Sequence, residues 1–151
     1  MDKLEVLKRS DIFHYLDEDD LKTIGDMATE ETFKPGEIIF RQGEDSDKIY
    51  VIEEGLVSII IELGPTDKRQ VQAATNLECF GWSATIPPYR RVRTAKALEK
   101  TKVYSFNGME LRKLVHTNPR LCAAIAGGVA YVISQRLKMA FEQIIGFTYL
   151  C

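Results

Sequence analysis

Short β-rich runs separated by Pro and Gly fill the middle of the chain, and they restrict the fold more than any other feature. Pro35-Gly36, Gly43, Gly55 and Gly64-Pro65 separate the first runs, and such residues favour turns over regular structure. The runs cover residue 33 and residues 37–40, 48–52, 56–63, 71–75, 93–98 and 101–106. Seven or eight strands at such short spacing predict an antiparallel β barrel or jelly roll.

Helical patterns flank this β region on both sides. Asp17 precedes an acidic turn and Leu21, a pattern typical of a helix N-cap, so we expect N-terminal helices within residues 1–29. After the last strand Asn107 can cap a further helix, and Pro119 suits the first position of the next. The predicted fold is therefore mainly β, with N-terminal helices and a long C-terminal helix.

Apolar residues recur at steps of three and four along the last helix. They are Ala126, Val129, Ile133, Leu137, Ala140 and Ile144. This predicted stripe could cover the barrel or pair with its copy in a second subunit. Gly127-Gly128 interrupts the pattern and indicates either a bend or a close helix contact.

Length and composition indicate one domain. With 151 residues, of which 45% are apolar, the chain can bury one ordinary core. We expect a single domain over 1–151, made of N-terminal helices (1–29), a jelly roll (30–106) and C-terminal helices (107–146). A net charge of -2 gives no indication of nucleic-acid binding.

The sequence lacks the features expected of a membrane-spanning, disulfide-rich, metal-binding or enzymatic protein. The apolar runs 57–61 and 121–133 are too short or too interrupted to span a bilayer, and the charged residues 1–10 form no signal peptide. The cysteines, 79, 122 and 151, are widely spaced, which argues against disulfides and metal knuckles and favours a reducing, cytoplasmic location. His14 and His116 lie far apart in helical regions and near no candidate nucleophile, so we expect no metal, no required cofactor and no enzyme.

Residues 79–97 form a candidate anion-binding cassette. Gly81 can adopt a backbone conformation that other residues avoid, and Ser83, Ala84 and Thr85 could begin a short helical turn whose amides face a phosphate. Arg90, Arg91 and Arg93 follow and supply planar, permanently charged groups that fit phosphate or carboxylate. The alternative is a packed surface turn around Trp82 with solvated arginines.

Residues 33–44 and 49–57, Phe80-Gly81, and Arg91 with Thr94 and residues 97–99 together resemble the cyclic-nucleotide-binding domain superfamily. That family includes the sensor domains of the catabolite activator protein class, of protein kinase A regulatory subunits and of gated ion channels. The resemblance extends from about residue 4 to 137. It implies a jelly roll with helices at both ends, a cassette that holds the phosphate and ribose of a cyclic nucleotide, and a last helix that closes over the base and mediates dimers.

The cassette departs from the family pattern at one important position. The family usually places a Glu after the Gly to accept the ribose 2′-hydroxyl, whereas this chain has Trp82, whose indole can donate but not accept. Losing that acceptor costs roughly 1 to 3 kcal/mol. Arg91 aligns with the phosphate-binding Arg, although a one-residue shift would put Arg90 there, and Arg93 falls where a small Ala is common. A cAMP or cGMP ligand, a different anionic or aromatic ligand, and a pocket filled by Trp82 all remain open.

These observations predict a non-enzymatic, ligand-sensing regulatory domain. The predicted ligand-binding residues are Gly81, Trp82, Ser83, Ala84, Arg90, Arg91 and Arg93. The expected partners are a small anionic ligand and a second copy of the chain, which would form a homodimer through the C-terminal helix. Only residues 146–151 follow that helix, too few for a helix-turn-helix, so we expect no direct DNA binding. The alternative function is a structural or dimerising module with an occluded pocket.

Overall fold

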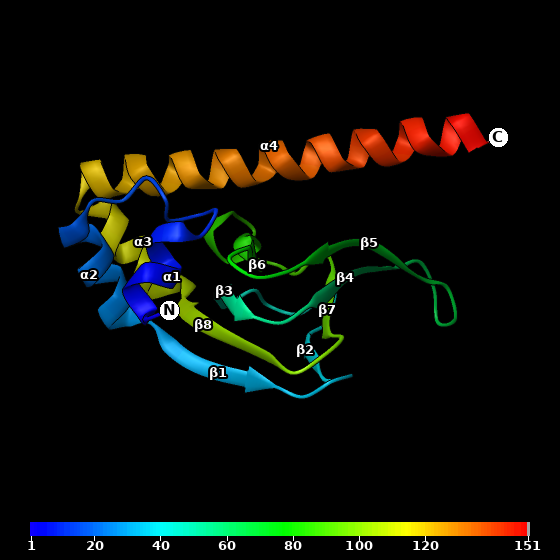
Figure 1. Cartoon of the computed structure of the whole chain (residues 1–151), viewed down its shortest axis with the longest axis horizontal. Coiled ribbons are helices and arrows are strands. Elements are labelled where there is room, and N and C mark those ends of the chain that lie inside the picture. The colour runs from blue at the N-terminus through cyan, green and yellow to red at the C-terminus, as the bar shows by residue number, and fades with distance from the viewer. Residues whose placement is uncertain (151) are drawn as a thin grey trace.

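The computed structural model describes the backbone of residues 1–150 and the side chains of residues 1–146; Cys151 lies outside the described residues. Two N-terminal helices precede eight strands, and two further helices follow them (Figure 1). In chain order the elements are α1 (Lys3–Arg9), α2 (Glu18–Met27), β1 (Thr29–Phe33), β2 (Ile38–Phe40), β3 (Lys48–Glu54), β4 (Val57–Glu62), β5 (Lys68–Ala74), β6 (Cys79–Phe80), the 3-10 helix η1 (Trp82–Thr85), β7 (Thr94–Ala97), β8 (Thr101–Asn107), α3 (Gly108–His116) and α4 (Pro119–Leu150).

The strands form two four-stranded sheets, and all their pairings are antiparallel. The strand orders are β1-β8-β3-β6 and β2-β7-β4-β5. Except for the β4–β5 hairpin, neighbouring strands in each sheet are not consecutive in the chain, as is typical of a jelly roll. This arrangement confirms the predicted fold class.

Side-chain caps fix where the predicted helices begin. The Asp17 carboxylate accepts a hydrogen bond of 2.9 Å from the Asp20 amide at the start of α2. The Asn107 side chain accepts one of 3.0 Å from the Glu110 amide at the start of α3. Each cap satisfies an amide that has no partner within its helix, so both predicted N-caps are confirmed.

The apolar interior is divided between two clusters. The helical cluster joins the four helices to the nearest strands and contains Phe13 and Phe106, whose rings meet edge to face at 5.1 Å. The barrel cluster lies between the two sheets and contains Tyr50 and Phe80, whose rings stack at 4.8 Å. The site described below lies beside the barrel cluster.

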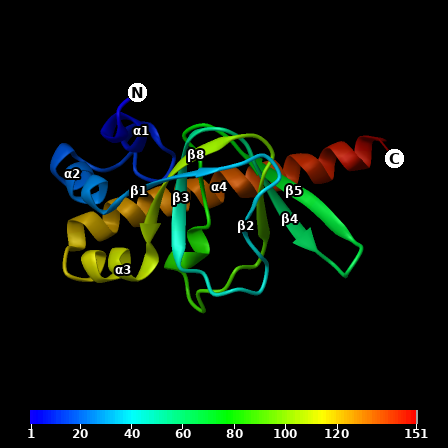
Figure 2. The ribbon, with the colours of Figure 1, turned by 90° about the horizontal axis from the view of Figure 1, so that it is seen from below.

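The long helix α4 crosses the helical end of the molecule and continues along the β4–β5 hairpin (Figures 1 and 2). It extends to Leu150, beyond the expected end at residue 146. No helix within the described residues is both long and apolar enough to cross a membrane.

The buried face of α4 is not the predicted stripe. Among the side chains of α4 that the structure describes, the buried apolar ones are Leu121, Ile125 and Val132, whereas Ile133 and Leu137 are 39% and 51% exposed. Of the two roles offered for the stripe, covering the barrel is therefore wrong for these two side chains. Buried positions depend on which way the helix is rotated against the domain, and apolar spacing alone does not fix that rotation.

The Gly127-Gly128 pair marks a close contact, and α4 continues through it as one helix. A Cβ atom at Gly128 would lie 1.8 Å from the Ile12 carbonyl oxygen, and one at Gly127 would lie 3.2 Å from the Tyr15 ring. These glycines allow α4 to approach the backbone that follows α1. The close-contact alternative is confirmed.

Candidate functional site

The cassette begins with a turn that requires glycine. Gly81 has φ of 78° and precedes η1, so the predicted short helical turn is confirmed. A Cβ atom at this position would lie 2.8 Å from Nη1 of Arg91 and 3.1 Å from the Lys48 carbonyl oxygen. Gly81 therefore provides both the left-handed backbone and the space for the arginine.

Arg91 is built into this turn. Its side chain is 1% exposed, and it donates hydrogen bonds of 2.9 Å to the Gly81 carbonyl and 2.6 Å to the Lys48 carbonyl. The guanidinium carbon lies 3.8 Å from the centre of the Phe40 ring, and Nη2 lies 3.8 Å from the Asp47 carboxylate. Burial lowers the pKa of Arg91 from its ordinary value. Most of the hydrogen-bond donors of Arg91 thus stabilise the conformation of the cassette.

One donor of Arg91 remains unsatisfied. Among the side chains that the structure describes, Nε of Arg91 is a buried polar atom without a hydrogen-bond partner. Buried donors are normally paired, because leaving one unpaired costs free energy. Nε thus remains an unpaired donor that protein atoms screen from solvent.

The other predicted residues have different surroundings. Arg90 is exposed and forms an ion pair of 3.0 Å with Asp45. The Ala84 amide donates to the Gly81 carbonyl at 3.2 Å. The Ser83 hydroxyl lies 2.8 Å from that of Ser46. Arg90 and Ala84 thus already have partners within the protein.

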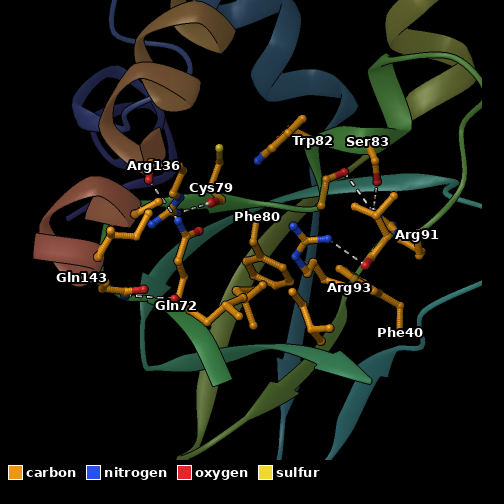
Figure 3. Close-up of a pocket in the computed structure, with 17 residues that line it drawn as sticks. Phe40, Gln72, Cys79, Phe80, Trp82, Ser83, Arg91, Arg93, Arg136 and Gln143 are labelled. Carbon is orange, nitrogen blue, oxygen red and sulfur yellow. Dashed lines mark hydrogen bonds between the residues drawn. The ribbon is translucent and has the colours of Figure 1, made fainter. Parts of the chain in front are cut away.

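A cavity of about 600 Å³ opens between the cassette, the β4–β5 hairpin and α4 (Figure 3). Five predicted residues line it: Gly81, Trp82, Ser83, Arg91 and Arg93. The other two, Ala84 and Arg90, are not among the lining residues. Whether the five contact a ligand stays a prediction.

Trp82 lies at the boundary between the cavity and the helical cluster. Its side chain is partly buried and packs against that cluster. It also forms part of the cavity wall. The cavity remains open beside the indole.

The family assignment follows from the sequence match and agrees with this architecture. The model of the cyclic nucleotide-binding domain family matches residues 30–118, more than half of the chain. The chain belongs to this family. The matched region contains β2 to β8, all of β1 except Thr29, and the whole cassette.

Relatives of this cyclic nucleotide-binding domain occur in larger proteins. A protein of Rhodopseudomonas palustris assigned as a potassium channel is 32% identical over 121 residues, which are 80% of this chain and 29% of that protein. The cAMP-dependent protein kinase regulatory subunit of Dictyostelium discoideum is 26% identical over 113 residues, 73% of this chain and 35% of that protein. The chain thus spans about a third of the length of these curated relatives.

One solved structure has nearly the same extent as this domain. It is the crystal structure of a protein from Geobacter metallireducens assigned as a cyclic nucleotide-binding protein. The two chains are 27% identical with a TM-score of 0.80, and the match covers 91% of this chain and 99% of that one. This similarity supports the jelly roll with a long C-terminal helix.

Arg136 is a site residue that the sequence analysis missed. It comes from α4, and its side chain is 11% exposed. It donates a hydrogen bond of 3.1 Å to the Cys79 carbonyl and forms an ion pair of 3.6 Å with Glu78. A sequence signal existed, because Arg136 follows Val132 by four residues and so continues the buried face of the helix. A charged residue on a buried face indicates a partner or a site.

The strand β6 connects α4 to the N-terminal segment. The Asp11 carboxylate accepts a hydrogen bond of 2.9 Å from the Cys79 amide, while Arg136 bonds the carbonyl of the same residue. Burial raises the pKa of Asp11 to about 6, and burial also raises the pKa of the Cys79 thiol. Cys79 is therefore a buried core residue with little thiolate.

The structure offers no metal centre within its described residues. No group of three His, Cys, Asp or Glu side chains there is arranged to hold a metal ion. The Nδ1 atom of His14 lies 2.7 Å from the Asp11 carbonyl oxygen. His14 thus has a local structural partner.

Proposed function

We propose that this cyclic nucleotide-binding domain is a non-enzymatic sensor whose ligand is a small anion held in the cavity beneath α4. The supporting observation is the charge of the cavity wall. Arg91, Arg93 and Arg136 line the cavity, and none of its described lining residues is Asp or Glu. Guanidinium groups suit carboxylate and phosphate, and the volume lies within the range of small-molecule sites.

The open cavity favours this sensor over the occluded structural module. Trp82 packs towards the helical cluster and leaves about 600 Å³ beside it. The described lining residues also include no His, Asp or Glu to act as a general base. The proposal therefore assigns the cavity to binding.

A cyclic nucleotide is the first ligand to test. The Dictyostelium relative is named for its dependence on cAMP, and Arg91 occupies the position that the family resemblance gives to the phosphate-binding Arg. We expect cAMP and cGMP to bind weakly, because Trp82 replaces the acceptor for the ribose hydroxyl.

We also propose that α4 pairs with α4 of a second copy. Ile133, Leu137 and Phe141 are 39%, 51% and 55% exposed, and they recur at steps of four along the helix. Exposed apolar side chains at this spacing are typical of helix pairing. We expect a dimer in sedimentation at micromolar concentration and a monomer after Leu137→Glu. A monomeric unmodified chain would contradict the pairing.

Thermal shift and calorimetry test the ligand-sensing proposal directly. A molecule that binds the folded state raises the melting temperature once its concentration exceeds its dissociation constant. We expect at least one small organic anion or cyclic nucleotide to do so, and Ala140→Trp to abolish the effect by filling the cavity. Ser134→Trp, at an exposed position of the same helix outside both the cavity lining and the apolar stripe, is the matched control. No shift with any such compound at millimolar concentration would contradict the proposal.

A further inference from the structure

We infer that the cavity binds an amphipathic organic anion, with one acidic head group on an apolar body, and that Arg93 holds the head group. This inference rests on the proposed function and specifies the class of ligand. It follows from three features of the cavity: its apolar walls, the different hydrogen-bond and ion-pair partners of its arginines, and the lack of a carboxylate among its described lining residues.

The cavity walls suit an apolar body. The two strands of the hairpin contribute Ile59, Ile61 and Val71, and α4 contributes Ala140. The aromatic rings of Phe40 and Phe80 form another part of the wall. Removing apolar ligand surface from water is favourable in proportion to its area, so these walls favour a hydrocarbon or aromatic skeleton.

Two of the three arginines already have partners. Arg91 donates to two backbone carbonyls and lies 3.8 Å from Asp47. Arg136 donates to the Cys79 carbonyl and forms an ion pair with Glu78 at 3.6 Å. Their main contacts therefore lie within the protein.

Arg93 differs from both. It is exposed, lines the cavity, and makes a hydrogen bond of 3.0 Å to the neighbouring Val92 carbonyl. It has no ion pair with any carboxylate within the described residues. Its planar fork can therefore bind a carboxylate or sulfonate through two hydrogen bonds.

A sugar suits this cavity less well than a simple apolar body. The neutral side chains of Gln72 and Gln143 line it, and the amide nitrogen of each already donates to a backbone carbonyl that joins β5 and α4. Ribose hydroxyls would meet the neutral amide oxygens of these glutamines but no carboxylate acceptor among the described lining residues, and hydrogen bonds to neutral acceptors are weaker than those to carboxylates. An anion without vicinal hydroxyls avoids this cost.

Two fluorescent probes that differ by one charge test the role of Arg93. These are 1-anilinonaphthalene-8-sulfonate, an amphipathic anion, and N-phenyl-1-naphthylamine, its neutral analogue. We expect the sulfonate to bind at one site and decanoate to displace it. Arg93→Gln should weaken the sulfonate about tenfold or more, as expected for loss of a charge-assisted pair. It should leave the neutral probe within about twofold, and Arg93→Lys should recover part of the loss.

Matched variants separate the cavity from other surfaces. Arg69→Gln removes an exposed arginine of β5 whose ion pair with Asp67 lies outside the cavity lining, so it should not change binding of the sulfonate. Ala140→Trp should abolish binding and Leu137→Glu should not. Far-UV circular dichroism checks that each variant is folded. Binding that survives Ala140→Trp but is lost in Leu137→Glu would place the probe on the exposed face of α4 and overturn the inference.

The failures of the two proposals can be distinguished. If cAMP displaces the sulfonate and decanoate does not, or if Arg93→Gln leaves sulfonate affinity unchanged, the ligand class or the role of Arg93 is wrong while the sensor proposal stands. If the sulfonate, decanoate, cAMP and cGMP all fail to bind at millimolar concentration, both proposals fail.

Discussion

The two halves of α4 perform different tasks in one continuous helix. In the first half Leu121, Ile125 and Val132 are buried in the helical cluster. In the second half Arg136, Ala140 and Gln143 line the cavity instead. Apolar packing therefore holds the first half in place, whereas the second half covers the cavity.

Hydrogen bonds join the second half to β5 and β6. Gln143 donates to the Val71 carbonyl at 3.0 Å, Gln72 donates to the Arg136 carbonyl at 3.2 Å, and Arg136 donates to the Cys79 carbonyl at 3.1 Å. Segments with little apolar burial open at a lower free-energy cost than packed ones. We therefore expect the stability of the fold to depend on the first half of α4, and the response to a ligand to depend on the second half.

Gly128→Ala should have the largest effect on stability. The new Cβ would lie 1.8 Å from the Ile12 carbonyl oxygen, so α4 or the segment after α1 must move. We expect the free energy of unfolding to fall by at least about 3 kcal/mol, measured by urea denaturation, because overpacking against backbone is relieved poorly.

Gly146→Ala is the matched control in the second half. A Cβ atom there would meet no atom within 4 Å, and Ala is the better helix former by about 1 kcal/mol at most. We expect stability to stay the same or rise slightly. Equal losses for the two variants would contradict the division of α4.

Ile125→Ala should have the next largest effect. Ile125 is 6% exposed in the helical cluster, whereas Ile145 is 55% exposed. Truncating a buried Ile removes apolar contacts and leaves a cavity, which costs about 2 to 4 kcal/mol. Chemical denaturation should show this loss for Ile125→Ala and a change below about 0.5 kcal/mol for Ile145→Ala. A large loss at position 145 would show that the second half also stabilises the fold.

Asp11→Asn should have a smaller, pH-dependent effect on the free energy of unfolding. Asp11 bonds the Cys79 amide, and Arg136 in the middle of α4 bonds the Cys79 carbonyl. The pKa of Asp11 is about 6 in the folded state against an ordinary value of 3.8. The folded state thus holds the proton more tightly, so the free energy of unfolding should fall as pH rises from about 4 to about 6.

Asp11→Asn should remove that fall, which we expect to amount to about 1 to 2 kcal/mol, because Asn can still accept from the Cys79 amide. Thermal melts across this pH range measure it. Asp26→Asn, at an exposed position of α2, controls for the change in net charge. An unchanged pH slope in Asp11→Asn would show that Asp11 is not the titrating group.

Local signals in the sequence predicted most of the fold. The caps Asp17 and Asn107, the turn at Gly81 and the close contact at Gly128 each depend on a residue type that suits one local geometry. The antiparallel strands followed from turn residues between short β-rich runs. The caps could be predicted because the interactions that determine them are local in sequence, whereas the partner of Gly128, the Ile12 backbone, is distant in the chain and could not be predicted.

The cavity was only partly predictable, because its residues are distant in the chain. The cassette motif identified Arg91 and Arg93, but spacing could not show that one is buried against backbone carbonyls while the other has no carboxylate partner within the described residues. Arg136 joins them from α4 through folding. The rotation of α4 likewise depends on the domain it contacts, which is why the predicted stripe did not match the buried face.

Hydrogen–deuterium exchange along α4, with and without saturating decanoate, tests the central claim most directly. A ligand in the cavity should slow exchange of the amides of residues 133–146, because the open form of this half would lose its contacts with the ligand. We predict clear protection there and little change in residues 121–132, which are already held by packing. Unchanged exchange in residues 133–146 at a decanoate concentration that raises the melting temperature would contradict the account.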